Sequence, residues 1–594
     1  MDPTPATAQD PTQVLDDKVQ AQLSRAFMGL SPIALGLAAA DWALHLAASP
    51  GKQMALAQKA WALSQQAMAQ GVQSAGQSAP EKDARFKNEA WSQWPYHALK
   101  EGFKASDAWW QEATQVDGMS RHHRHMVNFF TRQWLDALSP SNWAATNPEV
   151  LAKAQQTQGE SLRQGLAHWW NDMQALSKAR ADTPAEQLPP LTHAVGKDVA
   201  CTPGKVVFRN HLIELIQYLP TTSKVQPEPV LIVPSCIMKY YILDLSPHNS
   251  MVKYLVDQGH TVLIISWRNP DASDRDLKMQ DYLSGGVLAA MAAAKASTGA
   301  QRVHTMGYCL GGTFLAIVAA TLGRLSRKPA SQWTEKEKAL VPAGVPELAS
   351  VMLLAAQTDF SEPGELGVFI DDDQLAGLRR SMQEKGYLSG KEMGGSFQFL
   401  ASKDLVWSRN TQRYLLGEED ASFDLMSWNA DQTRLPARMH TEYLTSLFLN
   451  NALAHGQYRF AGATVALMDI RAPMLVVGTT RDHVSPWKSV YKIHLQTDTH
   501  VTFVLAAGGH NAGIVSEPGR PRRSYQIASV EDGQGWIDPD DWVAQAPVVQ
   551  GSWWEAMHAW LTARSGKPIT PPAMAAEHVV CDAPGEYVMV RYAD

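Results

Sequence analysis

The stretch that decides the fold is His304-Thr-Met-Gly-Tyr-Cys309-Leu-Gly-Gly-Thr313. It ends the apolar run RVHTMGY and leads directly into FLAIVAATL, residues 314–322, which has the composition of a buried helix. A strand, a sharp turn and a helix in this order form a nucleophile elbow, here with cysteine at the position that serine more often fills. The turn is so tight that a Cβ atom at Gly307 or Gly311 would collide with neighbouring chain. The pattern therefore predicts a catalytic thiol at Cys309 rather than a structural one.

A cysteine nucleophile requires a base, and the base requires a carboxylate that orients it. In an elbow-type site the chain order is nucleophile, acid, histidine. MLVVGTTRDHVSPW places Asp482 just after an expected strand, and VTFVLAAGGHNAG places His510, flanked by glycines, just after the next strand. His483 is a rival base, but it adjoins Asp482, and adjacent residues rarely form the acid–base pair of a triad. Asp482 and His510 are therefore the predicted partners of Cys309.

Two backbone N–H groups are expected to bind the oxyanion that forms on the reacting acyl group. One belongs to Leu310, which follows the nucleophile at the start of the helix. The second is expected in LIVPSCIMKYYILDL, where residues 235–237 follow an early strand, and we assign it to Cys236. Cys236 can also be interpreted as a second nucleophile, but the favoured interpretation is that its backbone matters more than its thiol.

Short apolar runs alternate with helical stretches on both sides of these motifs. After an expected hairpin in VVFRNHLIELIQYL come PVLIVP, TVLIISW, RVHTMGY, VMLLAA, MLVVGT and VTFVLAAG. Such runs, separated by helices, are typical of a mostly parallel sheet covered on both faces. Residues 358–470 lack this rhythm and are expected to form a helical cap over the carboxyl edge of the sheet. The predicted fold class is α/β, an α/β-hydrolase fold with an inserted helical cap, over residues 201–594.

The sequence before residue 201 has a different composition. Residues 1–20 are polar and proline-bearing and are expected to be disordered. Residues 21–200 are expected to form a helical N-terminal domain that ends in a proline-rich linker, residues 179–203. Ten tryptophans lie between residues 42 and 170. The favoured interpretation makes them core anchors of the helical domain, and the alternative makes some of them an apolar surface for a partner or a polymer granule.

Composition limits the function further. The 594-residue chain has a formal net charge of -7, which gives no support to a role in binding nucleic acid. Its four cysteines include no CxxC pair, so neither a disulfide scaffold nor a zinc site is expected, and a reducing cytoplasm fits best. The most apolar early stretch, residues 27–48, is interrupted by Asp41 and His45, so we expect no membrane span and no signal peptide. Without a phosphate loop, a dinucleotide fingerprint or a metal-ligand cluster, no cofactor is predicted.

Several longer motifs carry a family resemblance. CIMKYYILDLSP, QGHTVLIISWRNPD, GYCLGGT, RDHVSPW and GGHNAGIV, with DLVWSRN, FDLMSWNAD and GSWW, resemble polyhydroxyalkanoate synthases over residues 203–554. The CIMKYY and GYCLGG versions are similar to those of class I, the single-subunit type. The resemblance implies that Cys309 is the acylated nucleophile, His510 the general base and Asp482 its partner, and that the active form is a homodimer.

The resemblance also implies a reaction. A synthase of this kind polymerises (R)-3-hydroxyacyl-CoA, with 3-hydroxybutyryl-CoA as the expected monomer donor, into a polyester and releases CoA. The expected location is the cytoplasm, at the surface of polyester granules. One alternative is an intracellular polyester depolymerase or an acyl-CoA thioesterase on the same fold. The other is a non-catalytic granule-coating protein whose tryptophan-rich region binds polymer.

Overall fold

The computed structural model describes residues 12, 19, 30–72, 81, 83–178, 191–394, 406–419, 423–530 and 535–592. The disorder expected at residues 1–20 lies outside the described residues, apart from residues 12 and 19. So do residues 179–190 of the expected linker and residues 395–405 and 420–422 of the expected cap.

An eleven-stranded sheet forms the centre of the molecule, in the order β14-β13-β12-β11-β6-β5-β3-β4-β2-β1-β15. The pairings from β4 through β3, β5, β6 and β11 to β12 are parallel, and those at both edges are antiparallel. This confirms the predicted mostly parallel sheet and the hairpin of β1 and β2. The strands of this sheet are β1 (Gly204–Arg209), β2 (Ile213–Tyr218), β3 (Val230–Val233), β4 (Val262–Trp267), β5 (Arg302–Tyr308), β6 (Glu347–Leu354), β11 (Met474–Thr479), β12 (Val501–Ala506), β13 (Ser524–Val530), β14 (Val548–Gln550) and β15 (Cys581–Asp582).

Helices cover both faces of the sheet, which explains why its central strands are continuous apolar runs. In β3, Leu231 and Val233 belong to one buried cluster, and Val230 and Ile232 belong to the other. The first cluster contains residues of α10 and α11, and the second contains residues of α8 and α21. The helices of this part are α8 (Met251–Asp257), α9 (Met279–Asp281), α10 (Ala289–Thr298), α11 (Leu310–Leu325), α12 (Glu335–Leu340), α18 (Trp487–Tyr491), α19 (Ile493–Gln496), α20 (Pro539–Gln545) and α21 (Trp553–Thr562).

Between β6 and β11 the chain forms the inserted cap, whose described part consists of short helices and two small antiparallel strand pairs, β7 with β8 and β9 with β10. One of its helices, α16, brings Trp428 against the loop that follows β3, where the indole donates a hydrogen bond to the carbonyl of Lys239 (2.8 Å). The cap therefore lies over the carboxyl edge of the sheet. Its described elements are η9 (Gly364–Phe369), α13 (Asp372–Lys385), β7 (Tyr387–Leu388), α15 (Ser408–Asn410), η11 (Thr411–Leu415), α16 (Asp424–Ala430), β8 (Leu435–Pro436), α17 (Ala437–Tyr443), η12 (Leu444–Leu449), β9 (Arg459–Phe460), β10 (Ala463–Thr464) and η13 (Leu467–Asp469).

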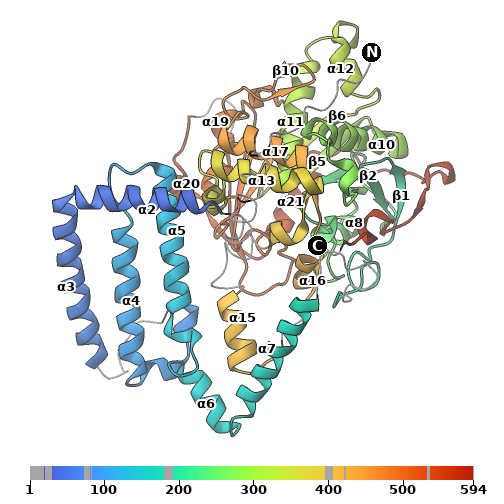
Figure 1. Ribbon diagram of the computed structural model, residues 1–594. Helices are drawn as coiled ribbons and strands as arrows, with labels where there is room; N and C mark the ends of the chain where they lie inside the picture. The colour runs from blue at the N-terminus through green and yellow to red at the C-terminus, as the bar shows by residue number, and fades with distance from the viewer. Residues whose placement is uncertain are drawn as a thin grey trace.

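The N-terminal part is helical, as predicted, and stands beside the α/β part (Figure 1). Its helices are α2 (Pro32–Ala47), α3 (Pro50–Val72), α4 (Tyr96–Ala113), α5 (Arg121–Leu138), α6 (Pro148–Gln156) and α7 (Glu160–Lys178). Helices α2, α5 and α6 begin at side chains that cap their first turn, Ser31, Ser120 and Asn147. In Figure 1, α3, α4 and α5 run side by side, and α2 crosses their ends.

The N-terminal helices are fastened to the cap at two places. Helix α5 contacts residues 362–371, where His122 lies 3.1 Å from Asp371. Helix α7 contacts η11, where Asp172 accepts hydrogen bonds from Arg413 (2.8 Å) and from the Tyr414 hydroxyl (2.8 Å). The backbone of Tyr414 comes so close to Gly165 that a Cβ atom there would lie 1.9 Å from its carbonyl oxygen. The cap and the helical part are therefore in direct contact at both places.

Candidate active site

The chain turns sharply at Cys309, between β5 and α11. Cys309 has φ 51° and ψ -127°, in a region that residues with a side chain rarely adopt. Its own amide donates to the carbonyl of Leu354 on the neighbouring strand (2.9 Å), and its carbonyl accepts from Gly312 (2.9 Å). These bonds hold the strained turn and leave the cysteine partly exposed, although 13 residues of the following helix are buried.

Glycines make this turn possible because three segments of backbone meet there. A Cβ atom at Gly307 would lie 2.4 Å from the Cα of Gly312. One at Gly311 would lie 2.2 Å from the carbonyl oxygen of Val233, at the end of β3. The start of α11 is thus pressed against the loop after β3, which is the loop predicted to supply the second oxyanion donor. The first amides of a helix have no carbonyl partner within it, and Leu310 provides the first of them here.

Asp482 and His510 lie together at the same edge of the sheet. The Nδ1 of His510 is 2.8 Å from Oδ2 of Asp482. Asp482 follows β11 and is buried, and its Oδ1 accepts hydrogen bonds from the amides of Val484 (2.9 Å) and Ser485 (2.8 Å). The carboxylate is therefore fixed by backbone amides and is aimed at the imidazole, which selects the tautomer that leaves Nε2 free for the thiol.

The imidazole of His510, held by Asp482, lines the same cavity as the side chain of Cys309. Burial alone would lower the pKa of His510, but the negative charges of Asp482 and Cys309 outweigh it and raise that pKa well above its ordinary value. Tyr308 packs against the same ring, with 5.6 Å between ring centroids, and its hydroxyl donates to Asn511 (2.6 Å). The structure thus brings the three predicted residues together at one edge of the sheet, as a nucleophile, a base and an orienting carboxylate require.

The two rival residues lie near the site in different environments. Cys236 is buried, and burial raises the pKa of its thiol, so its sulfur is poorly suited to act as a nucleophile. His483 lines the same cavity as Cys309. Among the described residues no hydrogen-bond partner of the His483 ring is found, whereas His510 is held by a carboxylate. Both observations support the sequence-based choice of Cys309 and His510.

The loop that contains Cys236 is held from several sides. Trp267 donates from its indole to the carbonyl of Pro234 (2.8 Å), and Thr433 of the cap donates to the carbonyls of Cys236 (3.3 Å) and Ile237. Lys239 is buried and donates to two carbonyls of the C-terminal segment. These are the carbonyls of Val588 (2.7 Å) and Val590 (2.6 Å).

The contact between Lys239 and the C-terminal segment was missed by the sequence analysis. Burial lowers the pKa of Lys239 to about 8, although the nearby Asp431 raises it in part. Because the lysine binds backbone carbonyls, no residue type in the C-terminal segment signals the contact. The assignment of the second oxyanion donor to Cys236 stays a prediction.

The Cys309 side chain opens into a cavity of about 360 Å³. One wall is the loop of residues 509–512, which carries His510, and another is the loop of residues 235–239. The cap supplies the third wall through Leu425, Met426 and Trp428. The cap wall is apolar, as expected for a site that binds an acyl chain and restricts water.

A second, larger hollow of about 990 Å³ lies on the other side of His483. It is bounded by α5 of the helical part, by η9 and η12 of the cap and by the start of α18. Asp482 and His483 line it as well, so His483 lies between the two spaces. Among the described residues, no group of three or more His, Cys, Asp or Glu side chains could hold a metal ion. The expectation that no cofactor is needed stays a prediction.

The fold and the site define an α/β-hydrolase-fold protein with cysteine at the elbow, and family models agree. Residues 228–517 match the alpha/beta hydrolase fold. Residues 82–255 match the N-terminus of poly-beta-hydroxybutyrate polymerase (PhaC), and residues 10–52 match the model called poly-beta-hydroxybutyrate polymerase N terminal.

Similar proteins of known name indicate the family within this fold class. The chain is 36% identical to poly(3-hydroxyalkanoate) polymerase of Methylorubrum extorquens, over 86% of this chain and 81% of that protein. It is 34% identical to the poly(3-hydroxyalkanoate) polymerase subunit PhaC of Cupriavidus necator, over 89% of this chain and 86% of that protein. The chain therefore belongs to the polyhydroxyalkanoate synthase family, and it is an enzyme of the transferase kind.

In the described part of the chain no single helix is both long and apolar enough to cross a membrane. Helices α2 and α3 reach that threshold only when taken together, and they are bent by 91° at the break between them.

Proposed function

We propose that this enzyme polymerises (R)-3-hydroxyacyl-CoA, with 3-hydroxybutyryl-CoA as the expected donor, through an acyl thioester on Cys309. The observation that carries the proposal is that His510, held by Asp482, lies in one cavity with Cys309. Membership of the synthase family supplies the reaction, and this geometry supplies the residues.

In the loading step, the thiolate of Cys309 attacks the thioester carbonyl of the substrate. The carbonyl oxygen takes up negative charge, and the amides of Leu310 and Cys236 are proposed to bind it. The bond to the CoA sulfur then breaks, and the proton on His510 goes to the leaving thiolate. One thioester is exchanged for another, so the step is close to thermoneutral and the acyl group stays activated.

In the elongation step, a 3-hydroxyl group of another monomer or of a chain end attacks the acyl-cysteine. His510 accepts the hydroxyl proton, the carbon–sulfur bond breaks, and an oxoester is formed. Acylation removes the negative charge of Cys309, which is one of the charges that raise the pKa of His510. We therefore expect this pKa to fall on acylation, which prepares the imidazole to act as a base. Conversion of a thioester to an oxoester makes the step favourable.

A hydrolase on the same fold would use the same three residues with water as the acceptor. The test is purified protein with (R)-3-hydroxybutyryl-CoA, with thiol release and the fate of the acyl group followed together. Thiol release with insoluble polyester is expected. Release with free 3-hydroxybutyrate as the main product would instead assign the protein to the hydrolases.

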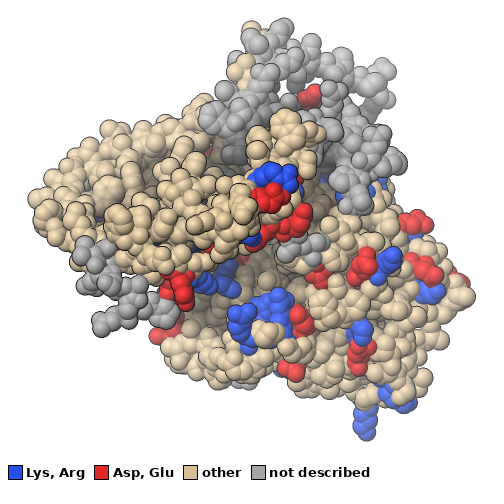
Figure 2. All heavy atoms as spheres, turned by 90° about the horizontal axis from the view of Figure 1, so that it is seen from below, with Lys and Arg blue, Asp and Glu red and all other residues tan. Residues whose placement is uncertain are grey.

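The helical part is proposed to attach the enzyme to its insoluble product in the cytoplasm. Six of its ten tryptophans are exposed, so the interpretation of these residues as core anchors is wrong for most of them. The exposed ones are Trp61, Trp94, Trp134, Trp143, Trp169 and Trp170. In Figure 2 the helical part, at the left, presents a surface with few charged side chains, whereas charges of both signs are scattered over the α/β part.

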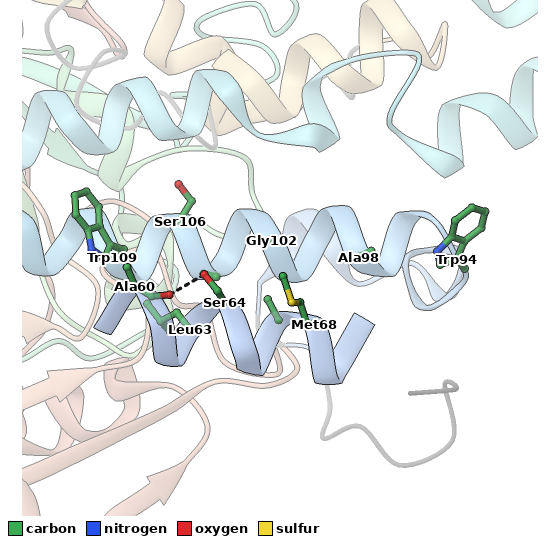
Figure 3. A pocket seen from close by; sticks show the side chains of 11 residues that line it. Ala60, Leu63, Ser64, Met68, Trp94, Ala98, Gly102, Ser106 and Trp109 are labelled. Carbon is green, nitrogen blue, oxygen red and sulfur yellow. Dashed lines mark hydrogen bonds between the residues drawn. The ribbon is translucent and has the colours of Figure 1, made fainter. Parts of the chain in front are cut away.

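An apolar groove of about 640 Å³ runs between α3 and α4 and adds to this surface (Figure 3). Leu63 and Met68 of α3 line it together with Trp94 and Trp109. An uncharged surface rich in aromatic side chains suits a polyester granule, which offers ester and methyl groups but no charge. We also propose a homodimer as the active form, which sedimentation of the purified enzyme with and without substrate would test.

A further inference from the structure

Two segments at the carboxyl edge of the sheet, beside the loop that carries His510, contain four arginines, of which Arg481, Arg520 and Arg523 are close enough for their charges to interact. Arg481 follows β11, and Arg520, Arg522 and Arg523 lie in the segment that leads into β13. We call these four residues the arginine cluster. Arg481 and Arg522 are exposed, whereas Arg520 and Arg523 are half-buried. The mechanism above uses none of them.

Hydrogen bonds fix the cluster to the catalytic loop. The amide of Arg481 donates to the carbonyl of Gly508 (2.8 Å), two residues before His510. The guanidinium of Arg523 donates to the carbonyl of Ala507 (3.2 Å). Ala507 lies three residues before His510, and three residues of extended chain span at most about 11 Å. Residues 509–512 line the Cys309 cavity. The cluster therefore lies close to the rim of the Cys309 cavity.

The positive charge of the cluster is poorly balanced. Arg520 forms an ion pair with Glu517 (3.3 Å). No carboxylate of the described chain lies within ion-pair distance of the other three arginines, and the buried Nε of Arg523 has no hydrogen-bond partner there. Burial, together with the charges of Arg520 and Arg481, lowers the pKa of Arg523, although the charge of Glu517 raises it in part. Like charges held together in this way repel one another, and a bound anion would relieve the repulsion.

Cations elsewhere around the two cavities are already neutralised or occupied. Lys239 is bound to backbone carbonyls. At the hollow on the other side of His483, Arg121 pairs with Glu362 (3.4 Å) and Lys488 pairs with Asp540 (2.6 Å). The arginine cluster is therefore the place near Cys309 where cationic side chains are most available to a ligand.

We propose that the arginine cluster binds the phosphate groups of the CoA thioester while its acyl end lies in the Cys309 cavity. The inference rests on the proposed function, because it requires a CoA substrate. Coenzyme A carries a diphosphate and a 3′-phosphate at the end of a long pantetheine arm, and arginine is the side chain best suited to bind phosphate oxygens in pairs. The cluster is a binding site and takes no part in the chemical steps.

The test compares two thioesters of (R)-3-hydroxybutyrate, one of CoA and one of N-acetylcysteamine, which has no phosphate. In the double variant Arg481→Ala/Arg522→Ala we expect KM for the CoA thioester to rise about tenfold, with kcat within about twofold of the wild type. KM for the N-acetylcysteamine thioester should not change. The pair Arg481→Lys/Arg522→Lys keeps the charge and should retain most of the affinity. Arg163→Ala, on an exposed position of α7, is the remote control.

Direct binding gives a readout that does not depend on turnover. Titration calorimetry with adenosine 3′,5′-bisphosphate, the nucleotide end of CoA, should show binding to the wild type that weakens about tenfold in the double alanine variant. If neither KM nor this binding changes, the inference is overturned. An equal rise of KM for both thioesters would also overturn it, because the arginines would then act through the shape of the His510 loop. A wild type that binds the nucleotide but releases no thiol would contradict the proposed function and leave the binding site supported.

Discussion

Most tryptophans of the helical part are exposed, whereas the pair in α21 of the α/β part is buried. In α21, Trp553 and Trp554 are each 1% exposed, and their indoles donate to the carbonyls of Gly513 (3.0 Å) and Ile514 (2.9 Å), just beyond His510. In the helical part, Trp61 is 70% exposed and Trp94 is 80% exposed. The same residue type therefore builds and braces the catalytic edge in one region and forms an outer surface in the other. Chemistry should depend on the first region and attachment on the second.

The largest expected effect sharpens this comparison within the α/β part. Cys309→Ala removes the sulfur that carries the acyl group and should lower CoA release by at least about 10³-fold. Cys236→Ala, a matched loss of a sulfur close by, should keep activity within about tenfold of the wild type. Stopped thiol-release assays of both variants measure the difference. Near-normal turnover by Cys309→Ala would contradict the assignment.

The second effect concerns the carboxylate. Asp482→Asn keeps the shape of the side chain but removes the charge that raises the pKa of His510, and it should lower kcat by roughly 10²–10⁴-fold. Because Asp482 raises this pKa, the variant should titrate His510 at lower pH than the wild type does. NMR titration of the imidazole in both proteins checks the sign. An unchanged His510 pKa would remove Asp482 from the account.

The third prediction compares the contribution to stability of a buried tryptophan in the α/β part with that of an exposed tryptophan in the helical part. Trp554→Ala should lower the free energy of unfolding by about 3–5 kcal/mol, because it empties a buried site. Trp61→Ala should change it by less than about 0.5 kcal/mol, because the side chain is exposed. Denaturant unfolding measures both.

Binding to isolated polyester particles should show the opposite order. Trp61→Ala combined with Trp94→Ala should lower the fraction that sediments with the particles, whereas catalysis of a soluble substrate should stay near the wild-type level. Equal particle binding by wild type and variant would contradict the attachment role of the helical part.

The smallest expected effect concerns the buried histidine His304 in the α/β part. Burial lowers the pKa of His304 to about 4, and its ring is hydrogen-bonded to Ser350 (2.7 Å) and Ser565 (3.0 Å). The folded state thus favours the neutral ring, so its contribution is complete above pH 6.5 and is lost as the pH falls toward 4. The loss at pH 4 is about 3 kcal/mol. His304→Gln should show a smaller fall of Tm between pH 7 and pH 4.5, and His455→Gln, at an exposed position, should behave like the wild type. An equal fall of Tm in all three would contradict the prediction.

The sequence was informative where geometry imposes residue types. The central strands could be predicted because both of their faces are buried, which makes them continuous apolar runs. The elbow could be predicted because backbone crowding at Gly307 and Gly311 excludes side chains. Strand β13 was missed because SYQIASV is half polar. It lies between β12 and the outermost strand β14, where most of its residues are only half-buried, so it needs no continuous apolar run.

Contacts between residues far apart in the chain could not be predicted from the sequence in the same way. His122 and His123 contact Asp371 (3.1 Å) and Asp41 (2.7 Å), and no spacing in the sequence indicates either contact. Whether the tryptophans of the helical part are exposed depends on how α3, α4 and α5 pack, and the pattern of single helices does not determine that. The cluster of arginines likewise becomes visible only when β11 and β13 are placed at one edge of the sheet.

The central claim is that Cys309 carries the acyl group as a thioester, and peptide mapping tests it most directly. The wild type is mixed with (R)-3-hydroxybutyryl-CoA, quenched in acid within the first turnovers, digested and analysed by mass spectrometry. The account predicts a 3-hydroxybutyryl adduct on the peptide that contains Cys309, labile to neutral hydroxylamine as a thioester is. An adduct on Cys236 or on a serine, or polymer formation with Cys309 never modified, would contradict it.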